Sequence, residues 1–393
     1  MIEEIAGLIL GLGSGLLSGL FPGIHLNTIS QWIVRLEPSS ELAAVFFIVA
    51  MNTMHTYCDF IPSILLGAPN ESNYLTALPG HKLFLRGKAL DAIEDSITGA
   101  LIGTGIAILF IPVFLQITEQ TKTMLPKLIP IVLILTTIGM IHSEKTTGRK
   151  IAAVLVTILS ATLGELALHG YSDALFPLVT GFFGISTLSL SYFETHQPKP
   201  QRLRTTPMPI GKLFFPAVLG SLGGSLVSLF PAIGPSQAAF TVSRLKKTST
   251  RQFLVLLSSL SSASMIYSFV ALFALNKART GSAAALQSIT TFSLFEFETS
   301  IGIILLCTGI AGITSLFLSR RLLSLIQSTD FRSITLGTIG LLLLLVFWWH
   351  GWNGLLLCLT ATSIGILCPR LHIKRSHCMA FLVLPTLLYY IRF

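Results

Sequence analysis

Two carboxylates flank a short apolar run within residues 59–73, which read DFIPSILLGAPNESN. Asp59 precedes the run and Glu71 follows it. At membrane depth a carboxylate costs about 2.5–3.5 kcal/mol on insertion scales, so it usually persists for a functional reason. We therefore predict Asp59 and Glu71 as candidates for binding a coupling cation, Na⁺ or H⁺. A position at the membrane interface would remove this argument for either residue.

The run between these carboxylates is too short to cross a bilayer as one helix. Pro62 and Pro69 bracket it, and polar residues follow together. The pattern favours a re-entrant hairpin with a turn at residues 67–70 and a second half-helix capped by Asn70, Ser72 or Asn73. The start of that half-helix would point backbone N–H groups and partial positive charge at an anion. An ordinary extramembrane turn is the alternative.

Composition places these residues in a membrane protein. Of 393 residues, 52% are hydrophobic and 11% are charged, whereas soluble domains carry about 25% charged residues. Apolar stretches of about 20 residues recur along the chain, each long enough to cross roughly 30 Å of hydrocarbon. The sequence predicts an all-α polytopic membrane protein with about ten to twelve membrane segments. The N-terminus lacks the basic residues of a cleaved signal peptide, so we expect the first helix to be retained.

An internal repeat relates the two halves of the chain. Residues 13–36 align without a gap on residues 222–245 at an offset of 209, with eight of 24 positions identical. In both copies an apolar helix containing glycine meets Phe-Pro, at Pro22 and Pro231, and a short polar stretch follows. We interpret each copy as a helix broken within the membrane, where freed backbone groups face a ligand or a wet cavity. A proline kink that only shapes packing is the alternative.

Charge around the repeats indicates their orientation. Glu3 and Glu4 precede the first copy, whereas Lys199, Arg202, Arg204 and Lys212 precede the second, as opposite starting sides require. We predict two inverted repeats with broken helices and re-entrant hairpins, and a reporter fused at residue 200 should read cytoplasmic. The predicted divisions are a first membrane repeat over 1–192, a Pro-rich basic linker over 193–210 and a second membrane repeat over 211–393.

Neutral and basic groups near the breaks complete the candidate binding site. Uncharged ligands alongside freed carbonyls suit a small anion or Na⁺, and an arginine meets a carboxylate bidentately. An exposed loop that follows the positive-inside rule explains Lys277 and Arg279 equally well. The predicted substrate-binding residues are Pro22, Gly23, Asn27, Ser63, Gly67, Pro69, Asn70, Ser72, Pro231, Ser236, Arg279 and Ser282.

Other classes of function find little support in the residues. The best catalytic fragment is His55 to Asp59, and no second cluster in an apolar context completes a metal site. The net charge of +9 comes from short basic clusters without interleaved aromatic residues, which favours anionic membrane lipids over nucleic acid. We expect no enzyme, no nucleic-acid binding and no cofactor besides a coupling Na⁺ or H⁺. A scaffold would not need helices broken within the membrane.

Residues 63–93, SILLGAPNESNYLTALPGHKLFLRGKALDAI, resemble the TctA family, the large membrane subunit of tripartite tricarboxylate transporters, and most closely its archaeal branch. The matching positions are Tyr57, Pro69, Thr76, Gly80, Gly87 and Ala89, and Pro22-Gly23 resembles the family's Pro-Gly break. Asn70 replaces a glycine, Pro79 replaces an aspartate, and Cys58-Asp59-Phe60 stands where Gly-Gly-Ser is expected, so the substrate stays open.

The resemblance implies a secondary active permease in a prokaryotic cell membrane, driven by a cation gradient and taking up a small organic anion, a di- or tricarboxylate. It also implies a small membrane subunit and an extracellular binding protein as partners; an oligomer is compatible with the sequence. A carrier for a lipid-linked phosphate is the alternative, because helix N-termini hold phosphate as readily as carboxylate. Competition among soluble citrate-like anions separates these two functions.

Overall fold

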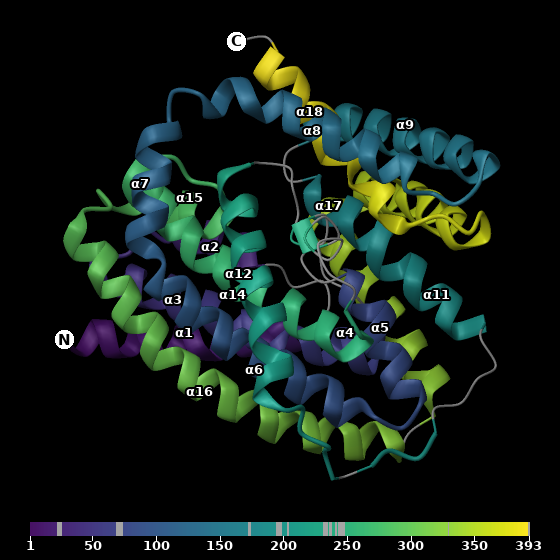
Figure 1. Ribbon diagram of the computed structural model, residues 1–393, viewed down its shortest axis with the longest axis horizontal. Coiled ribbons are helices and arrows are strands. Elements are labelled where there is room, and N and C mark those ends of the chain that lie inside the picture. The colour runs from purple at the N-terminus through teal and green to yellow at the C-terminus, as the bar shows by residue number, and fades with distance from the viewer. Residues whose placement is uncertain are drawn as a thin grey trace.

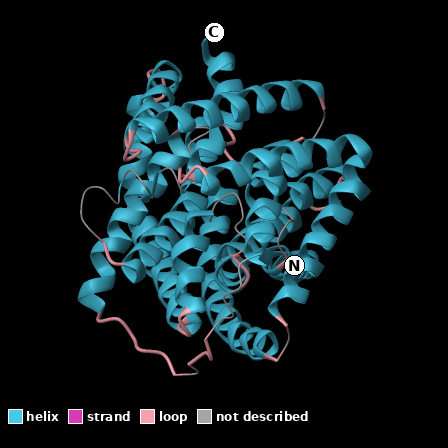
Figure 2. Cartoon of the chain, turned by 90° about the vertical axis from the view of Figure 1, so that its right-hand side faces the viewer, coloured by secondary structure: helices cyan, strands magenta, loops and turns pink. Residues whose placement is uncertain are grey.

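The computed structural model describes the chain apart from residues 22–25, 68–73, 172–173, 194–198, 203, 231–234, 236–237, 240–241, 243–247, 329 and 392–393. Every regular element in the described part is helical (Figure 2). The elements are α1 (Ile2–Leu20), α2 (Leu26–Arg35), α3 (Glu41–Cys58), α4 (Phe60–Leu65), α5 (Tyr74–Leu85), α6 (Ala89–Leu109), α7 (Ile111–Thr121), α8 (Leu125–His142), α9 (Thr147–Gly170), α10 (Leu175–Val179), the π-helix η1 (Thr180–Ile185), α11 (Ser186–Phe193), α12 (Ile210–Leu229), α14 (Thr250–Leu275), α15 (Gly281–Ile289), α16 (Leu294–Gln327), α17 (Phe331–Arg370), the 3₁₀ helix η2 (Arg375–Met379) and α18 (Ala380–Ile391).

Many of these helices are long enough to cross a membrane. In the described part of the chain, ten helices are long and apolar enough to cross a bilayer. The longest, α17, has 40 residues and breaks at Gly351, whose φ is 58°. Each part has about 20 residues and a length of roughly 30 Å, which suits one crossing. The predicted all-α polytopic membrane architecture is confirmed.

The helices form two groups, each drawing on both halves of the chain (Figure 1). In the first group α1 packs on α3, α12 packs on α14, α6 packs on α14, and α16 packs on α3. The second group joins α9, η1, α17 and α18 around Phe182 and Phe381. The predicted division of the chain at residues 193–210 stays a prediction.

Glycines bring the paired helices of the first group into close contact. A Cβ atom on Gly11 would lie 2.3 Å from the carbonyl oxygen of Phe47, and one on Gly220 would lie 2.3 Å from that of Leu256. Both pairs are related by the offset of 209 residues. Small residues allow helix backbones in a membrane to approach this closely. The repeat read from residues 13–36 therefore extends to the packing of α1 on α3 and of α12 on α14.

An ion pair between a partly buried arginine and a buried aspartate joins α6 to the first turn of α14. Arg251 donates from Nε to Asp95 Oδ2 at 2.5 Å and from Nη2 to Asp95 Oδ1 at 2.9 Å. The neighbouring Asp91 accepts a hydrogen bond from the backbone N–H of Thr206 in the linker. The described linker residues therefore lie at the end of α14 where the helix begins.

Arg251→Met is expected to destabilise the protein by about 3 kcal/mol, because it leaves the Asp95 carboxylate buried without its charge partner. The measurement is thermal unfolding of purified protein in detergent. Asp95→Leu combined with Arg251→Met should recover much of the loss, whereas Arg320→Met, which removes an exposed arginine of α16, should have little effect. If the Arg251→Met variant were as stable as the unsubstituted protein, the Asp95–Arg251 ion pair would not stabilise the fold.

A buried pair of a carboxylate and an imidazole lies in the other helix group. Glu144 Oε1 lies 3.1 Å from His377 Nε2 and accepts the backbone N–H of Lys374 at 3.1 Å. Burial lowers the pKa of His377 below its ordinary value of 6.5, and the hydrogen bond to Glu144 opposes this change. His377 is therefore held neutral at the junction of η2 with the segment between α8 and α9.

The protein should lose stability on acidification through this histidine. Because the folded-state pKa is depressed, the unfolded chain takes up the proton first, so stability is highest above about pH 6.5 and declines from there to the folded-state pKa. The unfolding temperature in detergent, measured between pH 8 and pH 5, should fall less steeply for His377→Gln. His169→Gln, at an exposed position, is the control and should keep the slope of the unsubstituted protein. Identical slopes for all three proteins would contradict the prediction.

Candidate functional site

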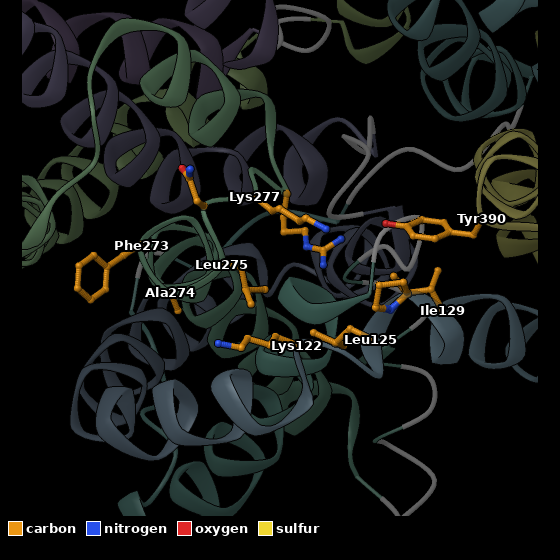
Figure 3. A pocket seen from close by; sticks show the side chains of 11 residues that line it. Lys122, Leu125, Ile129, Phe273, Ala274, Leu275, Lys277 and Tyr390 are labelled. Atoms are coloured by element: carbon orange, nitrogen blue, oxygen red, sulfur yellow. The ribbon is translucent and has the colours of Figure 1, made fainter. Parts of the chain in front are cut away.

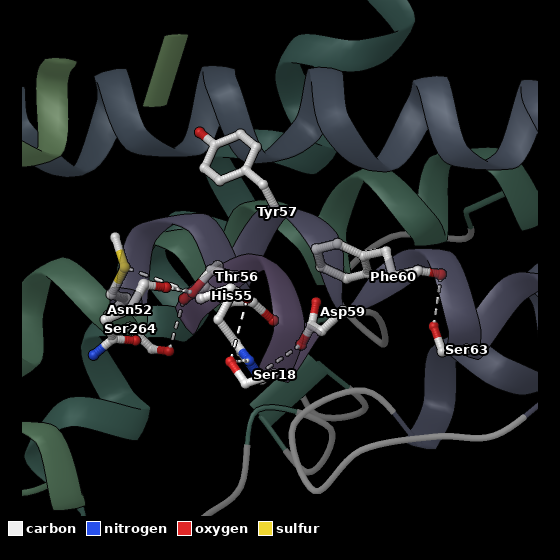
Figure 4. A network of polar contacts seen from close by, with 12 residues as sticks. Ser18, Asn52, His55, Thr56, Tyr57, Asp59, Phe60, Ser63 and Ser264 are labelled. Carbon is white, nitrogen blue, oxygen red and sulfur yellow. Dashed lines mark hydrogen bonds and ion pairs between the residues drawn. The ribbon is translucent and has the colours of Figure 1, made fainter. Parts of the chain in front are cut away.

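A polar cluster lies where α3 gives way to α4 (Figure 4). Asp59 is 3% exposed, and its Oδ2 lies 3.9 Å from His55 Nε2. The other ring nitrogen of His55, Nδ1, lies 2.9 Å from the hydroxyl of Ser18 on α1. One carboxylate, one imidazole and one hydroxyl therefore form a buried chain that joins α1 to the α3–α4 junction. Such a chain suits binding of a proton or a small cation.

One turn away, α3 contacts α14. The Thr56 hydroxyl donates to the backbone oxygen of Asn52 at 2.8 Å and lies 3.6 Å from Met265 Sδ, 209 positions further along the chain. The Asp59 cluster therefore lies next to a contact between α3 and α14. The predicted inverted repeats stay a prediction.

A second polar contact links the halves through α2 and α15. The hydroxyls of Ser30 and Ser282 lie 3.3 Å apart. A Cβ atom on Gly281 would lie 2.2 Å from Asn27 Oδ1, so Gly281 packs directly against this amide. Two predicted binding residues from opposite halves, Asn27 and Ser282, are thus brought to one place, beside the first turn of α15.

The predicted hairpin residues lie in and after α4. The Ser63 hydroxyl is buried and donates to the backbone oxygen of Phe60 at 2.9 Å. Gly67 has a φ of 68° and faces the ring of His81, whose Nδ1 lies 3.0 Å from Ile64 O. α4 packs on α5, so the chain folds back on itself after α4.

The remaining described candidate, Arg279, lines a pocket of about 390 Å³ (Figure 3). Lys122, Lys277 and Tyr390 share this pocket, and its other lining residues are Leu125, Pro126, Ile129, Phe273, Ala274, Leu275 and Asn276. Arg279 Nε is buried without a hydrogen-bond partner among the described residues. The pocket therefore presents three cations and a phenol, and none of its described lining residues carries a carboxylate.

The other predicted site residues lie outside the described part of the chain. They are Pro22, Gly23, Pro69, Asn70, Glu71, Ser72, Pro231 and Ser236. Their roles stay predictions.

The sequence indicated His55 only weakly and did not indicate Ser18, Lys122 or Tyr390. His55 and Asp59 are four residues apart, a spacing that places two side chains on one helix face and was a usable signal. No sequence pattern indicated Ser18, because its contact with His55 depends on how α1 packs on α3. Lys122 and Tyr390 likewise meet Arg279 only through the fold.

Comparisons with known proteins identify the chain. The model of the tripartite tricarboxylate transporter TctA family matches residues 5–380. An uncharacterized protein of Methanocaldococcus jannaschii is 29% identical over 395 residues, covering 98% of this chain and 98% of its own. No solved structure matches the chain. The protein is a multi-pass membrane protein of the prokaryotic cell membrane, and it belongs to the TctA family, the membrane component of tripartite tricarboxylate transporters.

Proposed function

We propose that this chain is a secondary active permease that takes up a di- or tricarboxylate and is driven by a Na⁺ or H⁺ gradient. The buried cluster of Asp59, His55 and Ser18 is the observation that carries the proposal. A carboxylate kept inside a membrane helix is costly, and coupling-ion binding is a reason to keep it. Carboxylate carriage itself is supported by membership of a transporter family rather than an enzyme family.

In this proposal the substrate binds between two inverted repeats. Two contacts between the halves support this proposal: Thr56 lies beside Met265, and α2 meets α15 where Ser30 contacts Ser282 and Asn27 lies against Gly281. Neutral amide and hydroxyl groups bind carboxylate oxygens without a buried countercharge. Arg279 is the remaining described group proposed to contact the substrate. Rocking of one repeat against the other, or sliding of the α4–α5 hairpin, would expose the site to each side in turn.

The partners follow the family pattern. Proteins of the TctA family form part of tripartite transporters. We infer that this chain works with a small membrane subunit and an extracellular binding protein that delivers the anion. The lipid bilayer is its remaining partner.

The experiment is uptake into proteoliposomes that contain the purified chain. Labelled di- and tricarboxylates are supplied with imposed Na⁺ or H⁺ gradients, with and without the small membrane subunit and the extracellular binding protein. We expect one acid to accumulate only when a gradient is present and to stop accumulating when an ionophore collapses it. If no acid moves under any of these conditions, the proposed substrate class is wrong, and lipid-linked phosphates form the next panel.

A further inference from the structure

The pocket formed by Lys122, Lys277, Arg279 and Tyr390, here called the cation pocket, draws on three separate parts of the chain (Figure 3). Lys122 follows α7, Lys277 and Arg279 lie between α14 and α15, and Tyr390 belongs to α18. Positive charge near helix ends offsets the helix dipole. The helix dipole does not explain why α18 places the Tyr390 hydroxyl beside these three cations.

Charge in the cation pocket is unbalanced. In the described part of the chain no aspartate or glutamate lines it, and none of the three cations lies within 4.0 Å of a carboxylate oxygen. The volume of about 390 Å³ falls in the range of small-molecule sites, roughly 300–1,000 Å³. The Arg279 guanidinium suits bidentate binding of a carboxylate, and the two lysines add point charges. The cation pocket thus fits an anion with two or three carboxylates.

The cation pocket and the linker lie at opposite ends of α14. Arg251, in the first turn of this helix, binds Asp95 close to the linker, whereas Phe273, Leu275 and Asn276 line the cation pocket at the other end. The 26 residues of α14 span about 39 Å, which exceeds the roughly 30 Å of hydrocarbon. The two ends therefore emerge on opposite faces of the membrane.

This placement bears on the direction of transport. The basic residues of the linker predict that it is cytoplasmic, which puts the cation pocket on the outer face. Outer loops are normally poor in lysine and arginine, so three cations that line one pocket without a carboxylate partner among the described residues need a separate reason. Three residues after Arg279, Ser282 contacts Ser30 where α2 meets α15.

We propose that the cation pocket is the outer-face capture site for the substrate, a multiply charged carboxylate, which then passes to the contact between α2 and α15. The inference rests on the proposed function for its substrate. It adds the point of entry and the groups that select the anion. Lys122, Lys277 and Arg279 supply charge, and Tyr390 donates a hydrogen bond.

Binding of labelled citrate to the purified chain in nanodiscs is the first test. Lys277→Gln combined with Arg279→Gln should weaken citrate binding at least tenfold, because each removes a charge-assisted contact. Arg279→Lys should show a smaller loss. Lys127→Gln is the matched control, since it removes a lysine five residues from Lys122 that does not line the pocket. Unchanged citrate binding in the double variant would overturn the proposal.

Inorganic phosphate serves as the competing anion. A tenfold excess over citrate should displace only a minor fraction of the label if the pocket is built for several carboxylates. Displacement as effective as that by unlabelled citrate would make the pocket a general anion site and overturn the substrate assignment.

The predicted membrane face is tested with Lys277→Cys and a membrane-impermeant maleimide. All five native cysteines are buried, so the introduced thiol is the reactive one. Labelling of intact cells, slowed by citrate, is the expected result. Labelling only in inverted vesicles would overturn the outer-face assignment.

Transport kinetics separate failure of this inference from failure of the proposed function. In proteoliposomes the double variant should raise the KM for citrate about tenfold, whereas Lys127→Gln should leave the KM unchanged. Gradient-driven uptake with an unchanged KM overturns the capture site alone. If the unsubstituted protein binds citrate in nanodiscs but transports no acid, the proposed function fails and the binding site stands.

Discussion

Asp59→Asn is expected to abolish gradient-driven accumulation of the substrate, lowering it at least a hundredfold to the level of empty liposomes. The substitution keeps the size of the side chain and removes its charge. Because Asp59 is 3% exposed and lies 3.9 Å from His55, the change takes the negative charge out of a buried pair. A cation that binds there would lose its countercharge, and its gradient could no longer drive uptake.

Counterflow distinguishes loss of coupling from loss of substrate binding. In this assay labelled substrate exchanges for unlabelled substrate without any ion gradient. If Asp59 serves only the coupling ion, the Asp59→Asn protein should exchange at a rate within about threefold of the unsubstituted protein. Loss of both accumulation and exchange would instead place Asp59 among the substrate ligands.

Asp330→Asn is the matched control for this charge removal. Asp330 caps the start of α17 by accepting the backbone N–H of Ser333, and asparagine caps a helix equally well. Accumulation by the control should equal that of the unsubstituted protein. If Asp59→Asn also accumulates substrate with an unchanged response to the gradient, the coupling site lies elsewhere.

Substitution of His55 tests which ion drives uptake. A proton passing to Asp59 has a route through the imidazole and the Ser18 hydroxyl, which lies 2.9 Å from Nδ1. A Na⁺ ion needs oxygen ligands and gains nothing from the ring. His55→Gln should therefore impair uptake driven by a proton gradient and spare uptake driven by Na⁺.

Much of the fold was predictable because the bilayer leaves few solutions. Apolar runs of about 20 residues specify spanning helices whatever their partners, since every backbone group must be satisfied within the segment. The repeat was equally accessible: α3 begins at Glu41 and α14 at Thr250, 209 residues apart, as the alignment of residues 13–36 requires. The break after α4 followed from prolines seven residues apart.

The contacts within the candidate site were less accessible, because they depend on which helices become neighbours. Asp59 stood out by its charge in an apolar run, yet nothing in the sequence pairs His55 with Ser18, 37 positions away. The same holds for Asp95 and Arg251, which are 156 positions apart. Helix packing supplies these pairs, and packing is set by the glycines that allow close approach.

Those glycines carry the second large effect. Gly11→Ala is expected to cost about 3 kcal/mol or more, because its Cβ atom would lie 2.3 Å from a backbone oxygen that cannot move without shifting α3. Gly220→Ala should cost a similar amount at the matching contact between α12 and α14. Unfolding temperatures of the purified variants in detergent measure both effects. A combined variant should lose the sum of the two, since the sites do not touch.

Gly13→Ala provides a control two residues away on the same helix. A Cβ atom on Gly13 meets nothing within 4 Å, so alanine should leave stability unchanged or raise it by up to about 1 kcal/mol through its better helix propensity. Gly211→Ala is the corresponding control in α12, where a Cβ atom also meets nothing within 4 Å. If alanine lowers stability at Gly11 and Gly220 but not at Gly13 and Gly211, the loss of stability comes from the close helix contacts. If Gly11→Ala and Gly13→Ala behaved alike, the close approach of α1 to α3 would not hold this helix pair together.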